Sequence, residues 1–226
     1  MYFRFKYFNL ICIVILLFIS YNSWYIVNNH FYDLDYKGLF EDRFIVFLMT
    51  KNCGRLSQKV LDYFPNLIAI SDIKCINNNF DNKTMIFEKK NDNLEINYKL
   101  KYKHVIEICK DSDNMLCLII EDDATFLHSK EKTRDIIVDN TISLFTNEGF
   151  AYDCSKRGFL LTTGMDNNKS LCRIIAKEYA KCLIKCFDKI KEPADITLGF
   201  CQDECGIKQK RFLIVQHSGK KSLLNH

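Results

Sequence analysis

The stretch Met115-Leu-Cys-Leu-Ile-Ile-Glu-Asp-Asp-Ala124 decides the fold of this chain, because an apolar run of strand length leads directly into three acidic residues. The run is continuously apolar and ends in two β-branched isoleucines, which is typical of a buried strand. The sequence therefore predicts a central strand at 115–120 whose carboxyl end carries Glu121, Asp122 and Asp123.

Strands and helices are predicted to alternate on both sides of this stretch. Pro65 is expected to stop the first helix, and the polar segment 76–93 to form a loop with a short strand at 85–87. Strands separated by helices predict an α/β domain, a sheet with parallel members that is flanked by helices. The other strands are predicted at 43–50, 66–70, 159–163 and 212–216, and the helices at 56–64, 100–109, 136–145 and 170–190.

Polar residues follow the predicted strands at the points where ligands bind in α/β proteins. Thr50 and Asn52 follow the strand at 43–50, and Asp72 follows the strand at 66–70. Because ligands bind beyond the carboxyl ends of the strands in such sheets, these residues and the acids at 121–123 are expected to converge on one site.

The adjacent carboxylates of Asp122 and Asp123 repel each other, and a divalent cation is the usual compensation. Mg²⁺ and Mn²⁺ are hard ions that take carboxylate oxygens and leave positions open for a substrate phosphate. Aspartate is also a frequent cap of a following turn or helix. From position alone both interpretations remain open.

Composition points to a folded domain rather than to a nucleic-acid-binding or disordered chain. The 226 residues are 48% hydrophobic and 27% charged, which suits one compact unit. The net charge is only +4, and the basic residues are scattered among acidic ones, so no basic surface for nucleic acid is expected.

The N-terminal segment is predicted to be a membrane anchor. Arg4 and Lys6 precede an uncharged stretch, and residues 8–27 supply the ~20 residues that a membrane helix needs. A cleaved signal peptide is the alternative. Positive charge before the span predicts a type II topology, with a cytoplasmic tail at 1–7, a span at 8–27, a stem at 28–42 and a lumenal domain at 43–226.

Cysteine usage agrees with a lumenal domain. Cys12 lies in the predicted span, and the other ten cysteines follow it, an even set that suits disulfide bonds in an oxidising compartment. The sequons that begin at Asn82 and Asn168 are glycosylation acceptors only in that compartment. A four-thiolate zinc site is the alternative for the cysteine pairs 182/186 and 201/205.

Two islands of sequence resemble one enzyme family. The first is Cys117-Leu-Ile-Ile-Glu-Asp-Asp-Ala-Thr-Phe-Leu127, preceded by Tyr102-Lys-His-Val-Ile-Glu-Ile-Cys109. The second is Pro193-Ala-Asp-Ile-Thr-Leu198 followed by Leu213-Ile-Val-Gln-His-Ser-Gly-Lys-Lys-Ser-Leu223. Together they resemble the post-GPI-attachment N-acetylgalactosamine transferase family, whose members carry a Glu-Asp-Asp-Ala motif.

The resemblance implies a GT-A fold and inverting, Mn²⁺- or Mg²⁺-dependent transfer of a sugar from a UDP-sugar to a glycan. In the family the sugar is N-acetylgalactosamine, the acceptor is a mannose of the GPI anchor, and the compartment is the Golgi or ER. By matching position, Asp122 and Asp123 would hold the metal and the diphosphate, with His217 as a third ligand. The nucleotide would be contacted by Thr50, Asn52, Asp72 and Glu121.

An inverting transfer needs one general base to take the proton of the acceptor hydroxyl. Asp195 is the first candidate and Glu204 the second. Asp195 is equally suited to cap a helix after Pro193, and His217 could be an ordinary surface histidine.

The chain departs from the resembled family at one point, because the family has a pair of membrane spans inserted in its catalytic domain. After Asn29 this sequence has no segment of the ~20 apolar residues that a span requires. A relative with another acceptor is therefore an alternative, as are a transferase using another UDP-hexose and a catalytically inactive, membrane-anchored binding module of the same fold.

Overall fold

The computed structural model of the chain describes residues 20, 40–75, 78–141, 150–155 and 171–217. The chain divides into two units, residues 1–41 and 42–226, of which the second contains the sheet. Most of the predicted tail, span and stem lies outside the described residues. Within the part that is described, no helix is both long enough and apolar enough to cross a membrane.

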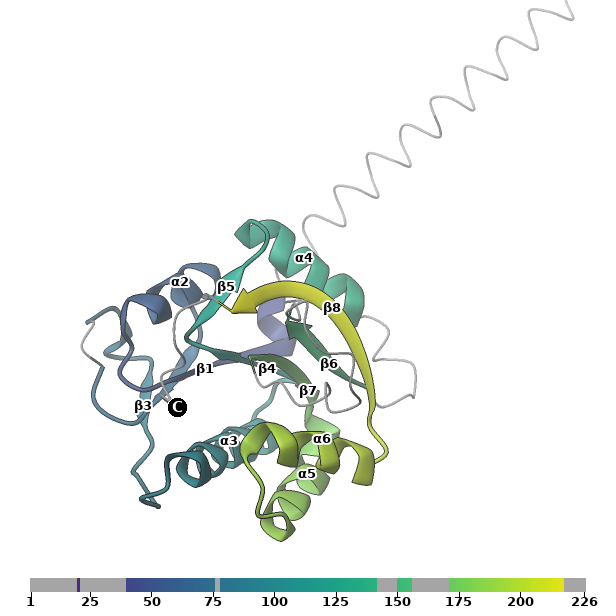
Figure 1. Cartoon of the computed structure of the whole chain (residues 1–226). Helices are drawn as coiled ribbons and strands as arrows, with labels where there is room; N and C mark the ends of the chain where they lie inside the picture. Colours follow the sequence, from purple (N-terminus) through teal and green to yellow (C-terminus); the bar gives the residue numbers. More distant parts are fainter. Residues whose placement is uncertain (1–19, 21–39, 76–77, 142–149, 156–170, 218–226) are drawn as a thin grey trace, which may run out of the picture. The chain divides into compact units, whose positions relative to one another are not determined.

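The second unit is built on one mixed sheet of eight strands in the order β3-β2-β1-β4-β7-β6-β8-β5 (Figure 1). Its strands are β1 (Phe44–Thr50), β2 (Ile68–Ser71), β3 (Thr84–Ile86), β4 (Leu116–Glu121), β5 (Ala124–Phe126), β6 (Phe150–Ser155), β7 (Cys172–Ala176) and β8 (Lys208–His217). The helices are α2 (Arg55–Tyr63), α3 (Leu94–Asp111), α4 (Lys130–Thr141), α5 (Lys177–Lys189), α6 (Ala194–Glu204) and a 3₁₀ turn, η1 (Asn78–Phe80).

The parallel part of the sheet aligns the strand ends that the sequence marks with polar residues. Strand β1 pairs in parallel with β2 on one side and with β4 on the other. The register places Thr50 opposite Ser71, and Met49 opposite Glu121. The carboxyl ends of β1, β2 and β4 therefore lie level, as the sequence predicts.

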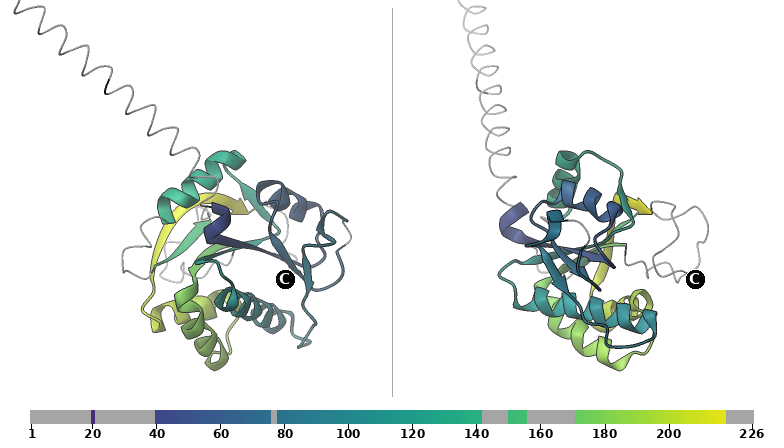
Figure 2. Two further views of the ribbon diagram at one scale, coloured as in Figure 1. Left: turned by 180° about the vertical axis from the view of Figure 1, so that it is seen from behind. Right: turned by 90° about the vertical axis from the view of Figure 1, so that its left-hand side faces the viewer.

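Helices cover both faces of the sheet. Figures 1 and 2 show α3, α5 and α6 on one face, and α2 and α4 on the other. Successive side chains of β4 point to opposite faces, so Cys117 and Ile119 pack into the core under α3, α5 and α6 while Leu118 and Ile120 face the other layer. Burying each such aliphatic side chain contributes about 1.5–3 kcal/mol, which explains why β4 is apolar on both faces.

The prediction of one helix over residues 170–190 is wrong in its first third. Residues 172–176 form β7, an antiparallel partner of β4, and α5 begins only at Lys177. All five residues of β7 are buried. Periodicity cannot distinguish a short, fully buried strand from a buried helical turn, and the apolar residues Leu171, Cys172, Ile174 and Ile175 fit both.

Other predictions differ from the structure in extent. Strands β5 and β6 and helix α6 were not expected, and α3 and α4 begin six residues before the predicted helices. Residues 142–145 of the predicted helix and the predicted strand at 159–163 lie outside the described residues.

Disulfide bonds confirm the prediction of an oxidised cysteine framework. The bonds Cys182–Cys205 and Cys186–Cys201 link α5 to α6, so the four-thiolate zinc interpretation of these cysteines is wrong. Two more bonds link α3 to β4, through Cys109 and Cys117, and the loops after β1 and β2, through Cys53 and Cys75.

Candidate functional site

A pocket that is open to solvent lies at the carboxyl ends of β1, β2 and β4. Helix α3 forms its remaining wall. The pocket brings together five of the predicted site residues, namely Thr50, Asp72, Glu121, Asp122 and Asp123. The other lining residues are Met49, Lys51, Leu94, Asn97, Tyr98 and Lys101.

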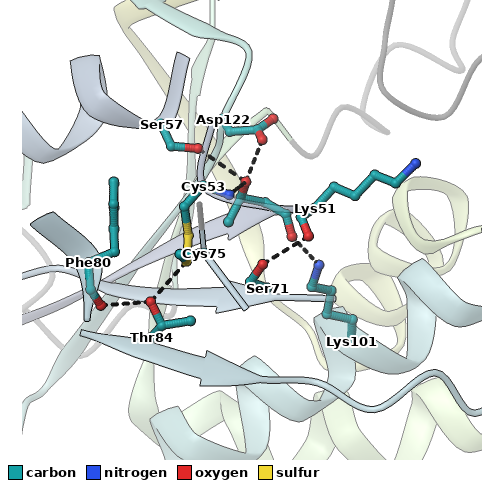
Figure 3. The surroundings of a disulfide bond; sticks show 10 residues. Lys51, Cys53, Ser57, Ser71, Cys75, Phe80, Thr84, Lys101 and Asp122 are labelled. Carbon is teal, nitrogen blue, oxygen red and sulfur yellow. Dashed lines mark hydrogen bonds between the residues drawn. A yellow bond between two sulfur atoms is a disulfide. The ribbon is translucent and has the colours of Figure 1, made fainter. Parts of the chain in front are cut away.

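Thr50 connects the end of β1 to the acidic motif after β4. Its hydroxyl donates a hydrogen bond of 2.6 Å to Asp122 Oδ2, and the backbone N–H of Asp122 donates to the Met49 carbonyl. The hydroxyl also lies 3.1 Å from Ser57 Oγ and accepts a hydrogen bond of 3.0 Å from the Cys53 N–H (Figure 3). Contacts across 72 residues of sequence therefore fix one oxygen of Asp122 in place.

The two aspartates of the motif are buried. Asp122 and Asp123 each expose only 6% of their surface. Burial raises the pKa of Asp122 to about 6, and the neighbouring Asp123 charge adds to the rise, while the Thr50 hydrogen bond and Lys101 oppose it. A pair of carboxylates in this state is stabilised by a cation.

Lys101 lines the pocket but was not among the predicted site residues. It extends from α3 into the pocket floor, where its side chain is 3% exposed and forms a 2.6 Å ion pair with Asp72. It also donates to the Thr50 carbonyl. Burial lowers the pKa of Lys101, whereas Asp72 and then Asp122 oppose that shift.

One face of α3 supplies the remaining wall of the pocket. Leu94, Asn97, Tyr98 and Lys101 recur at helical spacing on this face, and the Tyr98 hydroxyl donates a 2.6 Å hydrogen bond to Glu121 Oε1. Asn93 caps the helix by accepting from the N–H groups of Glu95 and Ile96. Asn97 and Lys101 share the buried face of Val105 and Cys109, at a spacing of four residues, so polar residues within the apolar stripe were the available signal.

The two partners of the Lys101–Asp72 ion pair differ in exposure, so replacing one or the other should change the stability of the chain by different amounts. We expect Asp72→Asn to lower the free energy of unfolding by about 2–3 kcal/mol, because it leaves the buried Lys101 ammonium without its counter-ion. Lys101→Met should cost less, since the side chain of Asp72 is 34% exposed and can be hydrated. Urea denaturation of both variants and of the double variant measures the difference; equal losses from the two single variants would contradict it.

The donor set fits a hard divalent cation that is completed by a substrate. Among the described side chains, no three of His, Cys, Asp or Glu converge closely enough to hold a metal alone. Mg²⁺ and Mn²⁺ commonly use only one or two carboxylates together with phosphate oxygens and water. The buried pair of Asp122 and Asp123 meets that requirement.

The other predicted site residues lie outside the pocket lining. Asn52 follows β1 but does not line the pocket, and the backbone of His217 pairs with Ala124, beside the acidic motif. Asp195 lies in the first turn of α6, where its carboxylate accepts the Ile196 N–H. Glu204 lies at the other end of α6 and forms a surface ion pair with Lys189.

Comparisons with solved structures identify the fold as one found in glycosyltransferases. A crystal structure of S. aureus TarS 1–349 in complex with UDP-GlcNAc matches 80% of this chain with a TM-score of 0.50 and 10% identity. The chain spans 59% of that structure. A structure of S. aureus TarS covers 78% of this chain, with a TM-score of 0.51, 10% identity and 36% of its own length matched.

A glycosyltransferase involved in the glycosylation of the major capsid of PBCV-1 also matches. Its TM-score is 0.50 at 7% identity, over 78% of this chain and 96% of the viral enzyme. No family model and no curated protein matches the sequence. This chain has a GT-A-like fold, and the predicted mixed sheet flanked by helices is confirmed.

Proposed function

We propose that this protein is a metal-dependent glycosyltransferase that takes a sugar from a UDP-sugar and transfers it to a glycan. The observation that carries the proposal is the pocket at the carboxyl ends of β1, β2 and β4, lined by paired acids in a GT-A-like fold. The TarS structure of the same fold holds UDP-GlcNAc, which supports a nucleotide-sugar donor.

The side chains at one end of the pocket would bind the metal ion, and those at the other end would bind the nucleotide base. Asp122 and Asp123 would hold Mn²⁺ or Mg²⁺, which when bound neutralises the negative charge that develops on a diphosphate leaving group. At the floor, Asp72 offers an acceptor and Lys101 a donor. This pair is complementary to the N3–H and carbonyl groups of uracil.

The finer parts of the proposal come from the family resemblance. They are an inverting displacement with Asp195 as general base, His217 as a further metal ligand, N-acetylgalactosamine as the sugar, and a GPI-anchor mannose as the acceptor. The disulfide bonds support a lumenal domain, as in a type II protein anchored by residues 8–27 in the Golgi or ER membrane.

Nucleotide binding to the full chain tests the proposal. Calorimetry with UDP, UDP-GalNAc, UDP-GlcNAc, UDP-glucose and UDP-galactose, with and without Mn²⁺, is expected to show binding that requires the cation. Because the pKa of Asp122 is raised to about 6, Mn²⁺-dependent binding should weaken as the pH falls through 6 and this carboxylate takes up a proton.

The same pKa fixes the sign of a stability change. The folded chain holds the Asp122 proton more tightly than the unfolded chain, so without metal this group contributes stability that is lost as the pH rises from about 4 to about 6. Mn²⁺ should therefore raise the melting temperature at pH 7 and have little effect at pH 5. Binding of UDP or a UDP-sugar that depends neither on Mn²⁺ nor on pH would contradict the proposal.

A further inference from the structure

The hydroxyl group of Thr50 has all of its hydrogen-bonding capacity in use. A threonine hydroxyl has one proton to donate and two lone pairs that accept. An ionised Asp122 can only accept, so the Thr50 proton goes to its Oδ2 atom, and Ser57 must donate to Thr50. The second lone pair accepts the Cys53 N–H. With both lone pairs occupied, the hydroxyl proton has a single direction, toward Asp122.

The position of the Cys53 N–H depends on an unusual backbone conformation. Among the described non-glycine residues, Cys53 alone has a positive φ, +52°, a region that L side chains rarely adopt. Its side chain is fully buried and is bonded to Cys75, in the loop after β2 (Figure 3). The disulfide therefore joins the two loops that follow β1 and β2, beside the pocket.

We propose that the Cys53–Cys75 disulfide is a positioning element for the acidic motif. The bond holds Cys53 in its left-handed conformation, the Cys53 N–H then orients the Thr50 hydroxyl, and that hydroxyl fixes Asp122 Oδ2. Cutting the bond allows the loop after β1 to relax, which frees the hydroxyl to rotate away from the carboxylate. The expected effect on ligand affinity rests on the proposed function, whereas the effect on the ligand-free protein does not.

A second disulfide of the chain provides a control outside the pocket. Cys182–Cys205 closes a separation of 23 residues, against 22 for Cys53–Cys75, but Cys186–Cys201 already closes 15 of those residues inside it, so the control bond constrains the unfolded chain less. The control bond links α5 to α6, and neither of its cysteines lines the pocket. Chain entropy acts through the unfolded state, so the coupling of each bond to Thr50, and not the size of the stability loss, reports on the pocket.

A double-mutant cycle with Thr50→Val tests the positioning role in the full chain. The variants are Cys53→Ser/Cys75→Ser and Cys182→Ser/Cys205→Ser, each made with and without Thr50→Val. The affinity for UDP is measured by calorimetry in the presence of Mn²⁺, and the urea midpoint is measured without any ligand. Cys53→Gly/Cys75→Ser provides a second form of the cut bond, because glycine adopts a positive φ without strain and keeps the variant folded.

Removing Cys53–Cys75 is expected to weaken UDP affinity about 10-fold when Thr50 is present, as for the loss of one hydrogen bond to a charged group. The loss should be less than about twofold in the Thr50→Val background, and the control bond should show neither effect. Additive effects in the cycle, or an equal loss from the control bond, would overturn the proposal. If the parent chain binds no UDP, the proposed function fails. The role of the disulfide is then decided by the ligand-free urea midpoints, which should be non-additive between Cys53→Ser/Cys75→Ser and Thr50→Val.

Discussion

Asp123→Asn is expected to lower Mn²⁺-dependent sugar transfer by at least about 100-fold, because the substitution removes a carboxylate charge and keeps the size of the side chain. Asp123 is 6% exposed and follows Asp122 at the end of β4, where a metal-diphosphate unit would need both charges. The affinity for UDP with Mn²⁺, measured by calorimetry, should fall with the rate.

Asp92→Asn is the matched control for this loss of charge. Asp92 is fully exposed and pairs with Lys89, three residues away, and neither residue lines the pocket. This variant should keep the parent rate and affinity. An Asp123→Asn protein that retains Mn²⁺-dependent transfer within a few-fold of the parent would show that the paired acids are not the metal site.

Asp195→Asn is expected to lower the transfer rate by about 100-fold while leaving the affinity for UDP unchanged, since a general base contributes at this level to proton transfer. Asp195 lies in the first turn of α6 and is partly exposed, so it is accessible to an acceptor. Steady-state kinetics with saturating UDP-sugar, together with calorimetry on the same variant, separates the rate from binding.

Glu204→Gln tests the other candidate base on the same helix. Its ion pair with Lys189 is at the surface, where such pairs contribute about 0–1 kcal/mol to stability, so the variant should fold and transfer sugar normally. A rate lost in Glu204→Gln and kept in Asp195→Asn would reverse the two assignments.

Local sequence predicted the strand that precedes the acids, because a continuous apolar run followed by charged residues can be recognised without knowledge of the rest of the chain. The same reasoning failed at residues 172–176, where a buried strand and a helical turn share one apolar pattern. Local sequence also could not predict how the cysteines pair, since the bonds Cys182–Cys205 and Cys186–Cys201 depend on how α5 packs against α6.

The sequence by itself determined that β4 ends at Glu121 and is followed by Asp122 and Asp123, and that β1 and β2 end near Thr50 and Asp72. These features follow from strand length and from the position of the first polar residue, which are local properties.

Only the tertiary structure decided which residues complete the pocket. Lys101 reaches Asp72 across 29 residues, and Thr50 reaches Asp122 across 72. The spacing of Lys101 with Val105 places it on the buried face of α3 but does not identify its partner, which is set by the strand order and by the packing of α3 on the sheet. The separation of Asp195 from Glu204 arises in the same way, because the two residues lie at opposite ends of a helix that the sequence did not predict.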